Sequence, residues 1–340
     1  MTYNVAVIGA TGVVGSMVLH LLAEKEFPIN ELRLFASERS AGREISFNDK
    51  IYEVEELNKD SFKNVDFAFF CAGSNIALEW VPIALESGSI VIDNSKVFRM
   101  NEDSSLIVPE INMNDFKGKG YVISNPNCST IQSVIPLNAL KKYGLKRVIY
   151  TTYQAVSGSG FKGIKEYYDT LNGLRESFYP YNINKTCIPQ VDEFLDNGYT
   201  KEEMKMVDET KKILHLPYLN ICATCVRVPV LNSHAVSVLV ELEKDFEVNE
   251  IIEDFKNQPG LVVLDEPMKS IYPTSIASNG NDIVYVGRIR KDLSHPSSLL
   301  FYCAADNIRK GAASNAVMIA KRIIEDGMLK WKKFREKTIA

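Results

Sequence analysis

Residues 4–15 read NVAVIGATGVVG, an apolar run followed at once by three glycines in the spacing G-x-x-G-x-x-G. The run 4–8 is typical of a buried parallel strand, and an apolar helical pattern follows at 17–22. Glycines at such a turn let a pyrophosphate approach the backbone and rest on the helix N-terminus. A tight turn with glycines for packing alone is the alternative. The stretch predicts a dinucleotide-binding βαβ unit whose candidate cofactor-binding residues are Gly9, Thr11, Gly12, Val13, Val14 and Gly15.

The residues after the second predicted strand, 32–37, bear on the choice between NAD and NADP. An acid there binds the ribose hydroxyl of NAD, whereas an arginine accommodates the 2′-phosphate of NADP. This chain has both, as Glu38 and Arg39. Arg39 with Ser37 and Ser40 favours NADP, and Glu38 argues against it. A solvated loop charge is the alternative for Arg39.

Strands and helices alternate through the first part of the chain. Strand patterns at 65–70 and 90–93 flank a helical pattern at 76–85. This alternation predicts an α/β fold of the Rossmann type, with a doubly wound parallel sheet. Such sheets bind ligands at the carboxyl ends of their strands, where residues 71–74 are expected. Arg99, just after the next strand, is a candidate anion ligand there.

The pattern after residue 128 is different. Strands are expected at 145–155, 219–229, 234–242, 283–290 and 299–305, which predicts an α+β domain with a mixed or antiparallel sheet. A final amphipathic helix, 308–324, is expected to pack on the first domain and to bring Asn315 near the nucleotide. We therefore assign residues 1–127 plus 306–340 to nucleotide binding, and 128–305 to catalysis and dimerisation.

Cys128 lies in the stretch SNPNCST (124–130), between a short strand and a helical pattern. The first turn of a helix exposes backbone N–H groups and the positive end of the helix dipole, which stabilise a thiolate. Cys128 is therefore a candidate nucleophile, and a small buried hydrophobe is the alternative. Pro136 falls inside this helix, where it is expected to remove a hydrogen bond; the sequence leaves open whether it also kinks the helix.

Four further candidates come from the second half of the chain. The small-residue loop 154–160 lets its backbone approach a ligand closely, which makes Ser157 and Gly158 candidate cofactor-binding residues, or it is simply a flexible turn. Glu209 and Lys212 share one face of a helix opened by a capping box at 200–203, and a surface ion pair is the alternative.

A hairpin-like break at 231–233 is expected to bring Arg227 and His234 to one end of a sheet. The pair Cys222 and Cys225 resembles a metal or redox motif. We reject that reading, because residues three apart in a strand point to opposite faces.

Composition limits the functional class. The chain has 340 residues, a net charge of -4 and a pI of about 5.8, which favour neither nucleic acid nor a membrane surface as partner. The N-terminal residues lack the pattern of a signal peptide, and no apolar run reaches transmembrane length. Six scattered cysteines do not form a small disulfide framework, so we expect a cytoplasmic protein.

Taken together, these motifs resemble those of aspartate-semialdehyde dehydrogenases, and the resemblance covers nearly the whole chain. It rests on the stretches 9–15, 36–42, 124–130 and 154–160, on Glu209-x-x-Lys212, and on Arg227 followed by His234. The resemblance implies reversible, NADP-dependent reductive dephosphorylation of L-4-aspartyl phosphate to the semialdehyde, through a cysteine thioester. It places the protein in lysine, threonine, methionine and isoleucine biosynthesis, as a homodimer that needs no metal.

The resemblance also implies individual roles. Cys128 corresponds to the acylated nucleophile, His234 to the general acid/base and Gln154 to the residue that orients the substrate. Glu209 and Arg227 correspond to the groups that hold the amino and carboxyl ends of the substrate. Arg99, Asn127 and Lys212 correspond to the residues that bind phosphate in this family.

Three other functions compete with this assignment. An N-acetyl-γ-glutamyl-phosphate reductase would share the fold and the cysteine chemistry, but its blocked amine would leave Glu209 without a use. A non-catalytic nucleotide-binding module would not need Cys128. A cysteine hydrolase would use Cys128 and His234 but would have no use for the glycine turn.

Overall fold

The computed structural model describes residues 1–118, 120–174 and 178–329, and the chain divides into two compact units. The first comprises Met1–Asn125 and the C-terminal segment from Ala313, and the second is Pro126–Ala312. The predicted boundaries at 127/128 and 305/306 lie close to these divisions. Residues 330–340 of the predicted nucleotide-binding domain lie outside the described part of the chain.

The first unit is built on one eight-stranded sheet, in the order β3-β4-β2-β1-β5-β6-β8-β7. All of its neighbouring strands are parallel except β3 and β4. Its strands are β1 (Tyr3–Ile8), β2 (Ile29–Ala36), β3 (Glu44–Phe47), β4 (Lys50–Glu56), β5 (Phe67–Phe70), β6 (Ile90–Asp93), β7 (Ser105–Leu106) and β8 (Ile123–Ser124). Its helices are α1 (Val13–Glu24), α2 (Ser74–Glu86), α3 (Pro109–Asn112) and α9 (Ser314–Glu325).

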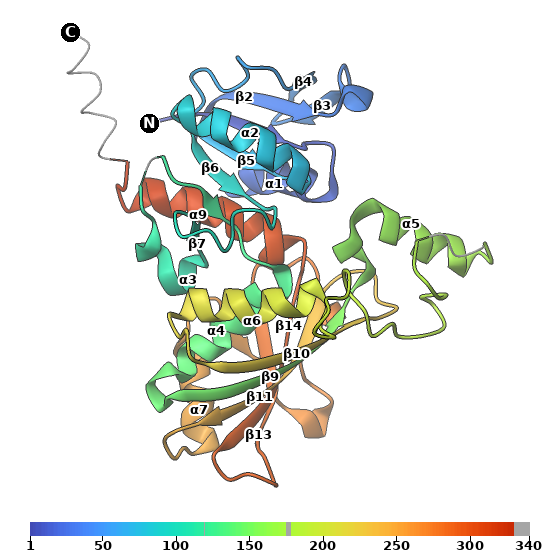
Figure 1. Ribbon diagram of the computed structural model, residues 1–340, viewed down its shortest axis with the longest axis vertical. Helices are drawn as coiled ribbons and strands as arrows, with labels where there is room; N and C mark the ends of the chain where they lie inside the picture. The colour runs from blue at the N-terminus through green and yellow to red at the C-terminus, as the bar shows by residue number, and fades with distance from the viewer. Residues whose placement is uncertain (119, 175–177, 330–340) are drawn as a thin grey trace. The chain divides into compact units, whose positions relative to one another are not determined.

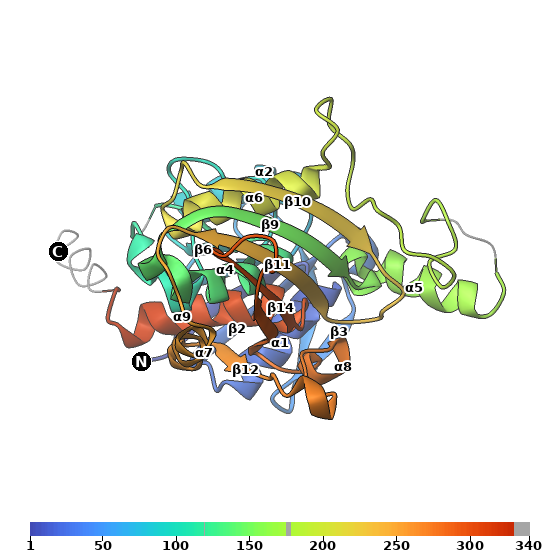
Figure 2. The ribbon, with the colours of Figure 1, turned by 90° about the horizontal axis from the view of Figure 1, so that it is seen from below.

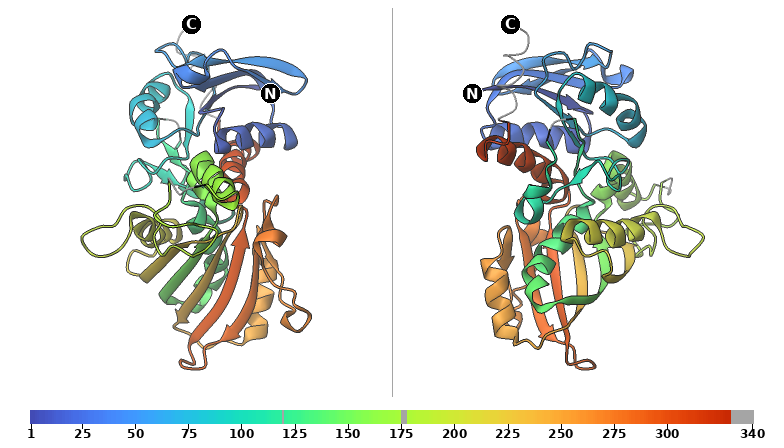
Figure 3. Two further views of the ribbon diagram at one scale, coloured as in Figure 1. Left: turned by 90° about the vertical axis from the view of Figure 1, so that its right-hand side faces the viewer. Right: turned by 60° about the vertical axis from the view of Figure 1, so that its left-hand side comes forward.

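Helices cover both faces of this sheet. On one face α1 and α9 pack against Val5, Val7 and Leu34, and α9 contributes Val317 and Ala320 to this core. On the other face α2 packs against a second core formed by alternate residues of the same strands. Figure 3 shows α1 and α2 on opposite sides of the strands. The predicted doubly wound sheet is confirmed, and so is the packing of the last helix on it.

The second unit holds a six-stranded mixed sheet, in the order β10-β9-β11-β14-β13-β12 (Figures 1 and 2). Its strands are β9 (Leu145–Gln154), β10 (Asn220–Arg227), β11 (His234–Leu242), β12 (Leu261–Val263), β13 (Val284–Lys291) and β14 (Ser298–Ala305). Its helices are α4 (Cys128–Leu140), α5 (Gly160–Leu171), α6 (Lys201–Leu214), α7 (Val248–Asn257) and α8 (Ser275–Ser278). Helices α4 and α6 lie side by side along the sheet.

The predicted hairpin between Arg227 and His234 is wrong. Strand β9 lies between β10 and β11, parallel to β10 and antiparallel to β11. The two residues still reach one edge of the sheet, because β10 ends there and β11 begins there. As predicted, Cys222 and Cys225 both lie within strand β10.

The proline in α4 is accommodated without a break, since the helix is continuous from Cys128 to Leu140. Pro136 has no N–H to donate to the carbonyl oxygen of Gln132, one turn earlier. The buried thiol of Cys303, from β14, donates to that oxygen instead, at 3.7 Å. A side chain of the sheet thus compensates in part for the missing helical hydrogen bond.

Candidate active site

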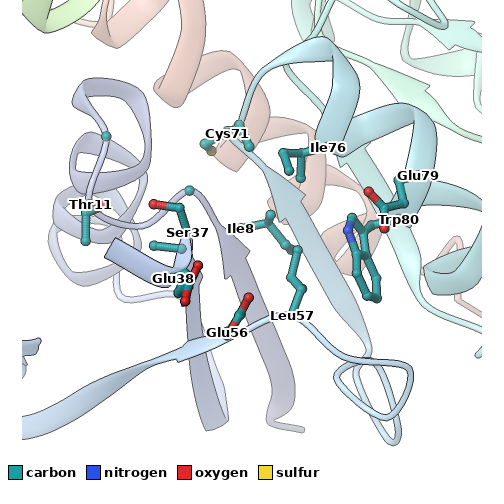
Figure 4. A pocket seen from close by; sticks show the side chains of 14 residues that line it. Ile8, Thr11, Ser37, Glu38, Glu56, Leu57, Cys71, Ile76, Glu79 and Trp80 are labelled. Atoms are coloured by element: carbon teal, nitrogen blue, oxygen red, sulfur yellow. The ribbon is translucent and has the colours of Figure 1, made fainter. Parts of the chain in front are cut away.

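The first unit has a pocket that is lined in part by the glycine turn. It has a volume of about 510 Å³ and lies at the carboxyl ends of β1, β2 and β5. Figure 4 shows Ser37 and Glu38 on one side of it and Trp80 on the other. Its lining includes the predicted residues Gly9, Thr11, Gly12 and Ser37, and also Glu38, Cys71 and Ala72.

The glycines of this turn are sterically required. Gly9 has φ +82°, and a Cβ on it would lie 2.8 Å from the carbonyl oxygen of Cys71. A Cβ on Gly15 would lie 2.1 Å from the carbonyl oxygen of Gly9. Helix α1 begins at Val13 with no side-chain cap and no acidic residue in its first turn. Its N-terminal N–H groups therefore suit a phosphate, and the turn fits a dinucleotide.

Besides Ser37, two more predicted cofactor residues follow β2, and another lies on α9. Arg39 and Ser40 belong to the short 3₁₀ helix η1 (Glu38–Ser40), where Arg39 is exposed. Asn315 is buried, and its amide nitrogen donates to the carbonyl oxygens of Ile107 and of the Asn125 side chain, at 2.9 and 2.7 Å. These bonds use both of its donors and tie α9 to the sheet, which leaves only its Oδ1 for a ligand.

Arg99 is buried beside the carboxyl end of β6. Its Nη2 donates to the carbonyl oxygen of Asn94 at 3.0 Å. Burial raises the pKa of Asp93, while hydrogen bonds from Ser95 and the positive charge of Arg99 oppose that rise. Arg99 therefore lies at the predicted edge of the sheet, where its charge is partly balanced by a neighbouring acid.

In the second unit, Cys128 is the first residue of α4 and is half-buried. Asn127 caps this helix: its Oδ1 accepts from the N–H groups of Ser129 and Thr130, at 3.0 and 3.2 Å. These two hydrogen bonds fix the first turn of α4. The side chain of Cys128 therefore lies at a helix start that Asn127 holds in place. The expected position of the cysteine at a helix N-terminus is confirmed.

The carboxylate of Glu209 is buried and accepts from the backbone N–H of Asn127, at 2.6 Å. A surface ion pair is therefore excluded as its main role. Lys212, one turn further along α6, is half-buried. Asn127, predicted to bind phosphate, uses its Oδ1 for the cap and one amide hydrogen for Glu202.

Three of the predicted residues meet at one edge of the mixed sheet. Gln154 ends β9 and pairs with Arg227, which ends the parallel strand β10. His234 begins the antiparallel strand β11, whose next residue pairs with Tyr153. A Cβ on Gly158 would lie 2.9 Å from Nη1 of Arg227 and 3.0 Å from Nε2 of His234. Both side chains therefore pack closely against Gly158, where a larger residue would displace them.

Two buried polar atoms at this edge have no hydrogen-bond partner among the described residues: Nε of Arg227 and Nε2 of His234. The Nη1 of Arg227 donates to the carbonyl oxygen of Ala155 at 2.6 Å, which fixes the guanidinium. Buried polar groups are normally satisfied, so orphaned atoms on two neighbouring side chains point to a polar ligand.

The structure also adds residues that the sequence patterns did not single out. Asn307 accepts from the backbone N–H of Ser233 and bonds the Ser157 hydroxyl, so it ties the small-residue loop to the segment before His234. Glu202 bonds both Asn127 and Gln154. Its position, seven residues before Glu209 and thus on the same helical face, was the only sequence signal for it. Among the described residues no group of acidic, histidine and cysteine side chains could hold a metal.

A Rossmann-type nucleotide-binding unit joined to a mixed-sheet α+β unit defines a class of two-domain dehydrogenases. Residues 4–119 match the family described as "Semialdehyde dehydrogenase, NAD binding domain", and residues 136–310 match "Semialdehyde dehydrogenase, dimerisation domain". Among residues 1–118, 120–174 and 178–329, no helix has the length and apolarity to span a bilayer.

Named relatives narrow this class. An aspartate-semialdehyde dehydrogenase of Aquifex aeolicus is 46% identical over 97% of this chain and 100% of its own, and one of Bacillus subtilis is 42% identical over 94% and 97%. The crystal structure of aspartate semialdehyde dehydrogenase II from Vibrio cholerae, complexed with ASA, has a TM-score of 0.91 and 42% identity, and covers 96% of this chain and 99% of its own. The chain belongs to the aspartate-semialdehyde dehydrogenase family, as the sequence motifs predicted.

Proposed function

We propose that the protein catalyses the reversible, NADP-dependent reductive dephosphorylation of L-4-aspartyl phosphate to L-aspartate 4-semialdehyde and phosphate. The reaction serves the biosynthesis of lysine, threonine, methionine and isoleucine. The observation that carries the proposal is the shared edge of the mixed sheet, where the side chains of Arg227 and His234 lie together beside Gly158 and each keeps one orphaned polar atom. An arginine next to a neutral donor suits a substrate with a carboxylate and a reacting carbonyl.

Cys128 acts as the nucleophile in this proposal. Its thiolate attacks the acyl carbon of aspartyl phosphate, the carbonyl π-electrons move to oxygen, and their return expels phosphate and leaves a thioester. The N-terminus of α4 favours the thiolate. When bound, the nicotinamide cofactor supplies the hydride that reduces the thioester carbonyl. The resulting hemithioacetal oxyanion collapses to the aldehyde and returns the thiolate of Cys128.

His234 stabilises the oxyanion in both steps. Burial, followed by the positive charge of Arg227, lowers the pKa of His234 to about 3, against an opposing effect of Glu202. The imidazole is therefore neutral at physiological pH. Its Nδ1 accepts the backbone N–H of Ala155 at 3.0 Å, so its proton resides on Nε2. We therefore propose a hydrogen-bond donor in place of the proton-transferring acid/base expected from the motif.

The remaining predicted residues bind the substrates. Arg227 holds the substrate carboxylate, Glu209 its amino group, and Lys212 the phosphate. Gln154 orients the acyl group beside Cys128. In the first unit, the turn 9–15 holds the pyrophosphate, and Ser37, Arg39 and Ser40 bind the 2′-phosphate of NADP. We assign the backbone of Ser157 and Gly158 to the substrate side of the site, because Gly158 lies against Arg227 and His234.

We further propose a homodimer formed through the second unit, in a reducing compartment such as the cytoplasm. The match of residues 136–310 to a dimerisation domain supports the dimer. Tyr153 on β9, which packs against Tyr302 of β14, is partly exposed on the sheet and offers contact surface. All six cysteines are free thiols, which suits reducing conditions. Sedimentation velocity would detect the dimer, and a monomer at micromolar concentration would disprove it.

The test is phosphate-dependent reduction of NADP by L-aspartate 4-semialdehyde, with N-acetylglutamate semialdehyde as the competing substrate. We expect turnover with the first aldehyde and almost none with the second. Cys128→Ser should bind NADP yet lose nearly all turnover. Cys187→Ser, which changes an exposed thiol, is the matched control and should keep it. Turnover by Cys128→Ser would remove the thioester from the mechanism.

A further inference from the structure

The carboxylate of Glu202 accepts hydrogen bonds from two side chains of the candidate site. Glu202 belongs to the first turn of α6 and is only 5% exposed. Its Oε1 accepts from Nδ2 of Asn127 at 2.8 Å and from Nε2 of Gln154 at 3.2 Å. Oε1 of Glu202 therefore links Asn127, which precedes Cys128, to Gln154, which ends β9.

This arrangement fixes the orientation of both amides. An ionised carboxylate can only accept hydrogen bonds, so Asn127 and Gln154 must each turn an NH₂ group toward it. The Oδ1 of Asn127 then faces the N–H groups that it caps at the start of α4. The amide nitrogen of Gln154 is also within 3.3 Å of the Thr152 hydroxyl, so the group that Gln154 can offer to a substrate is its carbonyl oxygen.

The carboxylate is held ionised from its other side. Its Oε2 accepts from Nζ of Lys205 at 2.8 Å, and Lys205 also donates to Asp192 at 2.9 Å. Burial alone would raise the pKa of Glu202, but Lys205 and the hydrogen bond from Asn127 outweigh it and keep that pKa below its ordinary value. A buried carboxylate of this kind needs such partners, and both of its oxygens have them.

Two carboxylates of helix α6 accept hydrogen bonds from Asn127. Glu202 binds its side chain, and Glu209, two turns further on the same face, binds its backbone N–H at 2.6 Å. The side chain and the backbone of the residue before Cys128 are thus both set by one helix. A shift of either carboxylate would move the start of α4.

We infer that Glu202 is a positioning residue of the reaction: it orients Asn127 so that α4 is capped at Cys128, and Gln154 so that its carbonyl oxygen faces the substrate. The inference rests on the roles proposed above for Cys128 and Gln154. Glu202 itself acts only through these two amides, so its effect belongs to kcat and not to the Michaelis constants of the cofactor.

The test compares Glu202→Gln with Glu203→Gln. A neutral amide cannot accept from Asn127, Gln154 and Lys205 at once, because one of its two terminal atoms is an NH₂ group. That NH₂ faces either the ammonium of Lys205, which can only donate and must move away, or the amides of Asn127 and Gln154, which must then flip. We expect kcat to fall about 10²-fold, the size of effect that a small misplacement produces. Glu203 is the matched control, because it is buried beside Glu202 but bonds the backbone N–H groups of Thr200 and Cys225. Glu203→Gln should lower the thermal midpoint yet leave kcat within about twofold.

A double-variant cycle separates positioning from general destabilisation. If Glu202 acts through Gln154, Glu202→Gln should cost much less activity in a Gln154→Ala background than in the wild type. Glu202→Asp, which keeps the charge but shortens the reach, should also lose kcat while remaining folded, and it serves if Glu202→Gln does not fold. Wild-type kcat in a folded Glu202 variant, or fully multiplicative effects with Gln154→Ala, would overturn the inference. Activity in Cys128→Ser would instead refute the proposed function.

Discussion

The backbone N–H of Ala155 donates a 3.0 Å hydrogen bond to Nδ1 of His234. A backbone N–H can only donate, so Nδ1 carries no proton while this bond exists. The neutral ring must then be protonated at Nε2, the atom that lies against Gly158 beside Arg227. One main-chain contact therefore decides which hydrogen-bonding group the histidine offers to a substrate.

The first prediction is that His234 stays neutral, as the Nε2–H tautomer, from pH 8 down to pH 5. Its pKa is lowered to about 3 by burial and by Arg227. In ¹⁵N spectra of histidine-labelled protein, one of four imidazole rings should show unequal, pH-independent ring-nitrogen shifts. That signal should vanish in His234→Gln. A ring that titrates near pH 6.5 and is lost in this variant would contradict the prediction.

The same lowered pKa makes a second prediction, on stability. The unfolded chain protonates this histidine near pH 6.5, whereas the folded protein does so only near pH 3. Between these values the unfolded state binds one more proton, so the free energy of unfolding falls as the pH falls, by about 1.4 kcal/mol per pH unit. Urea unfolding at pH 7.5 and 5.5 measures it. His234→Gln should lack this part of the acid sensitivity, and equal sensitivity in both proteins would disprove it.

A third prediction concerns Gly158. A methyl group there would lie within 3.0 Å of both Arg227 and His234 and would displace the two side chains that we assign to the substrate. Gly158→Ala should therefore raise the Michaelis constant for the semialdehyde about tenfold or more, and leave the dissociation constant of NADP nearly unchanged. Initial-rate kinetics and cofactor fluorescence titration measure the two constants. A selective loss of NADP binding would return residue 158 to the cofactor site, as the loop sequence suggested.

Local patterns predicted the first unit well because its signals are short-range. The strand 4–8, the glycine turn and the helix after it are contiguous, and Gly9 and Gly15 are required by contacts within that same unit. The hairpin between Arg227 and His234 could not be predicted correctly. Its error comes from β9, a strand more than 70 residues earlier that inserts between the two. Pairing over such a distance depends on tertiary packing and leaves no periodic trace.

The candidate site also combines residues that local sequence signals reveal with residues that only tertiary packing reveals. Cys128 and His234 could be singled out because their residue types and neighbours carry chemical meaning. Glu202 was not singled out, because the capping box at 200–203 involves Thr200 and Glu203, while Glu202 turns into the interior. Helical spacing put Glu202 and Glu209 on one face, but which face is buried is decided by the neighbouring helix α4.

A fourth prediction concerns Gly311, in the π-helix η6 (Arg309–Ala313). A Cβ on this residue would lie 2.8 Å from the Cβ of Cys128 and 3.2 Å from its Cα, closer than side chains can approach. Gly311→Ala should displace the first residue of α4, reduce kcat about 10²-fold and slow alkylation of Cys128 by iodoacetamide. Ala312→Gly, next to it in the same π-helix, is the control. Wild-type alkylation in Gly311→Ala would mean that η6 can move away without cost to the thiol.

The last prediction addresses cofactor preference, where two neighbouring charges oppose each other. Glu38 lines the pocket that follows the glycine turn, and its carboxylate would repel a 2′-phosphate while accepting from a ribose hydroxyl. Arg39, next in the exposed helix η1, would attract that phosphate. Arg39→Ala should therefore raise the Michaelis constant for NADPH about tenfold or more and change that for NADH little, whereas Glu38→Ala should weaken NADH and spare NADPH. Arg43→Ala is the matched comparison, because Arg43 lies on the other side of the turn, in a second pocket with Thr11. A loss selective for NADPH in Arg43→Ala, with Arg39→Ala unaffected, would move the phosphate contact to that side, and equal losses for both cofactors would remove it from Arg39 altogether.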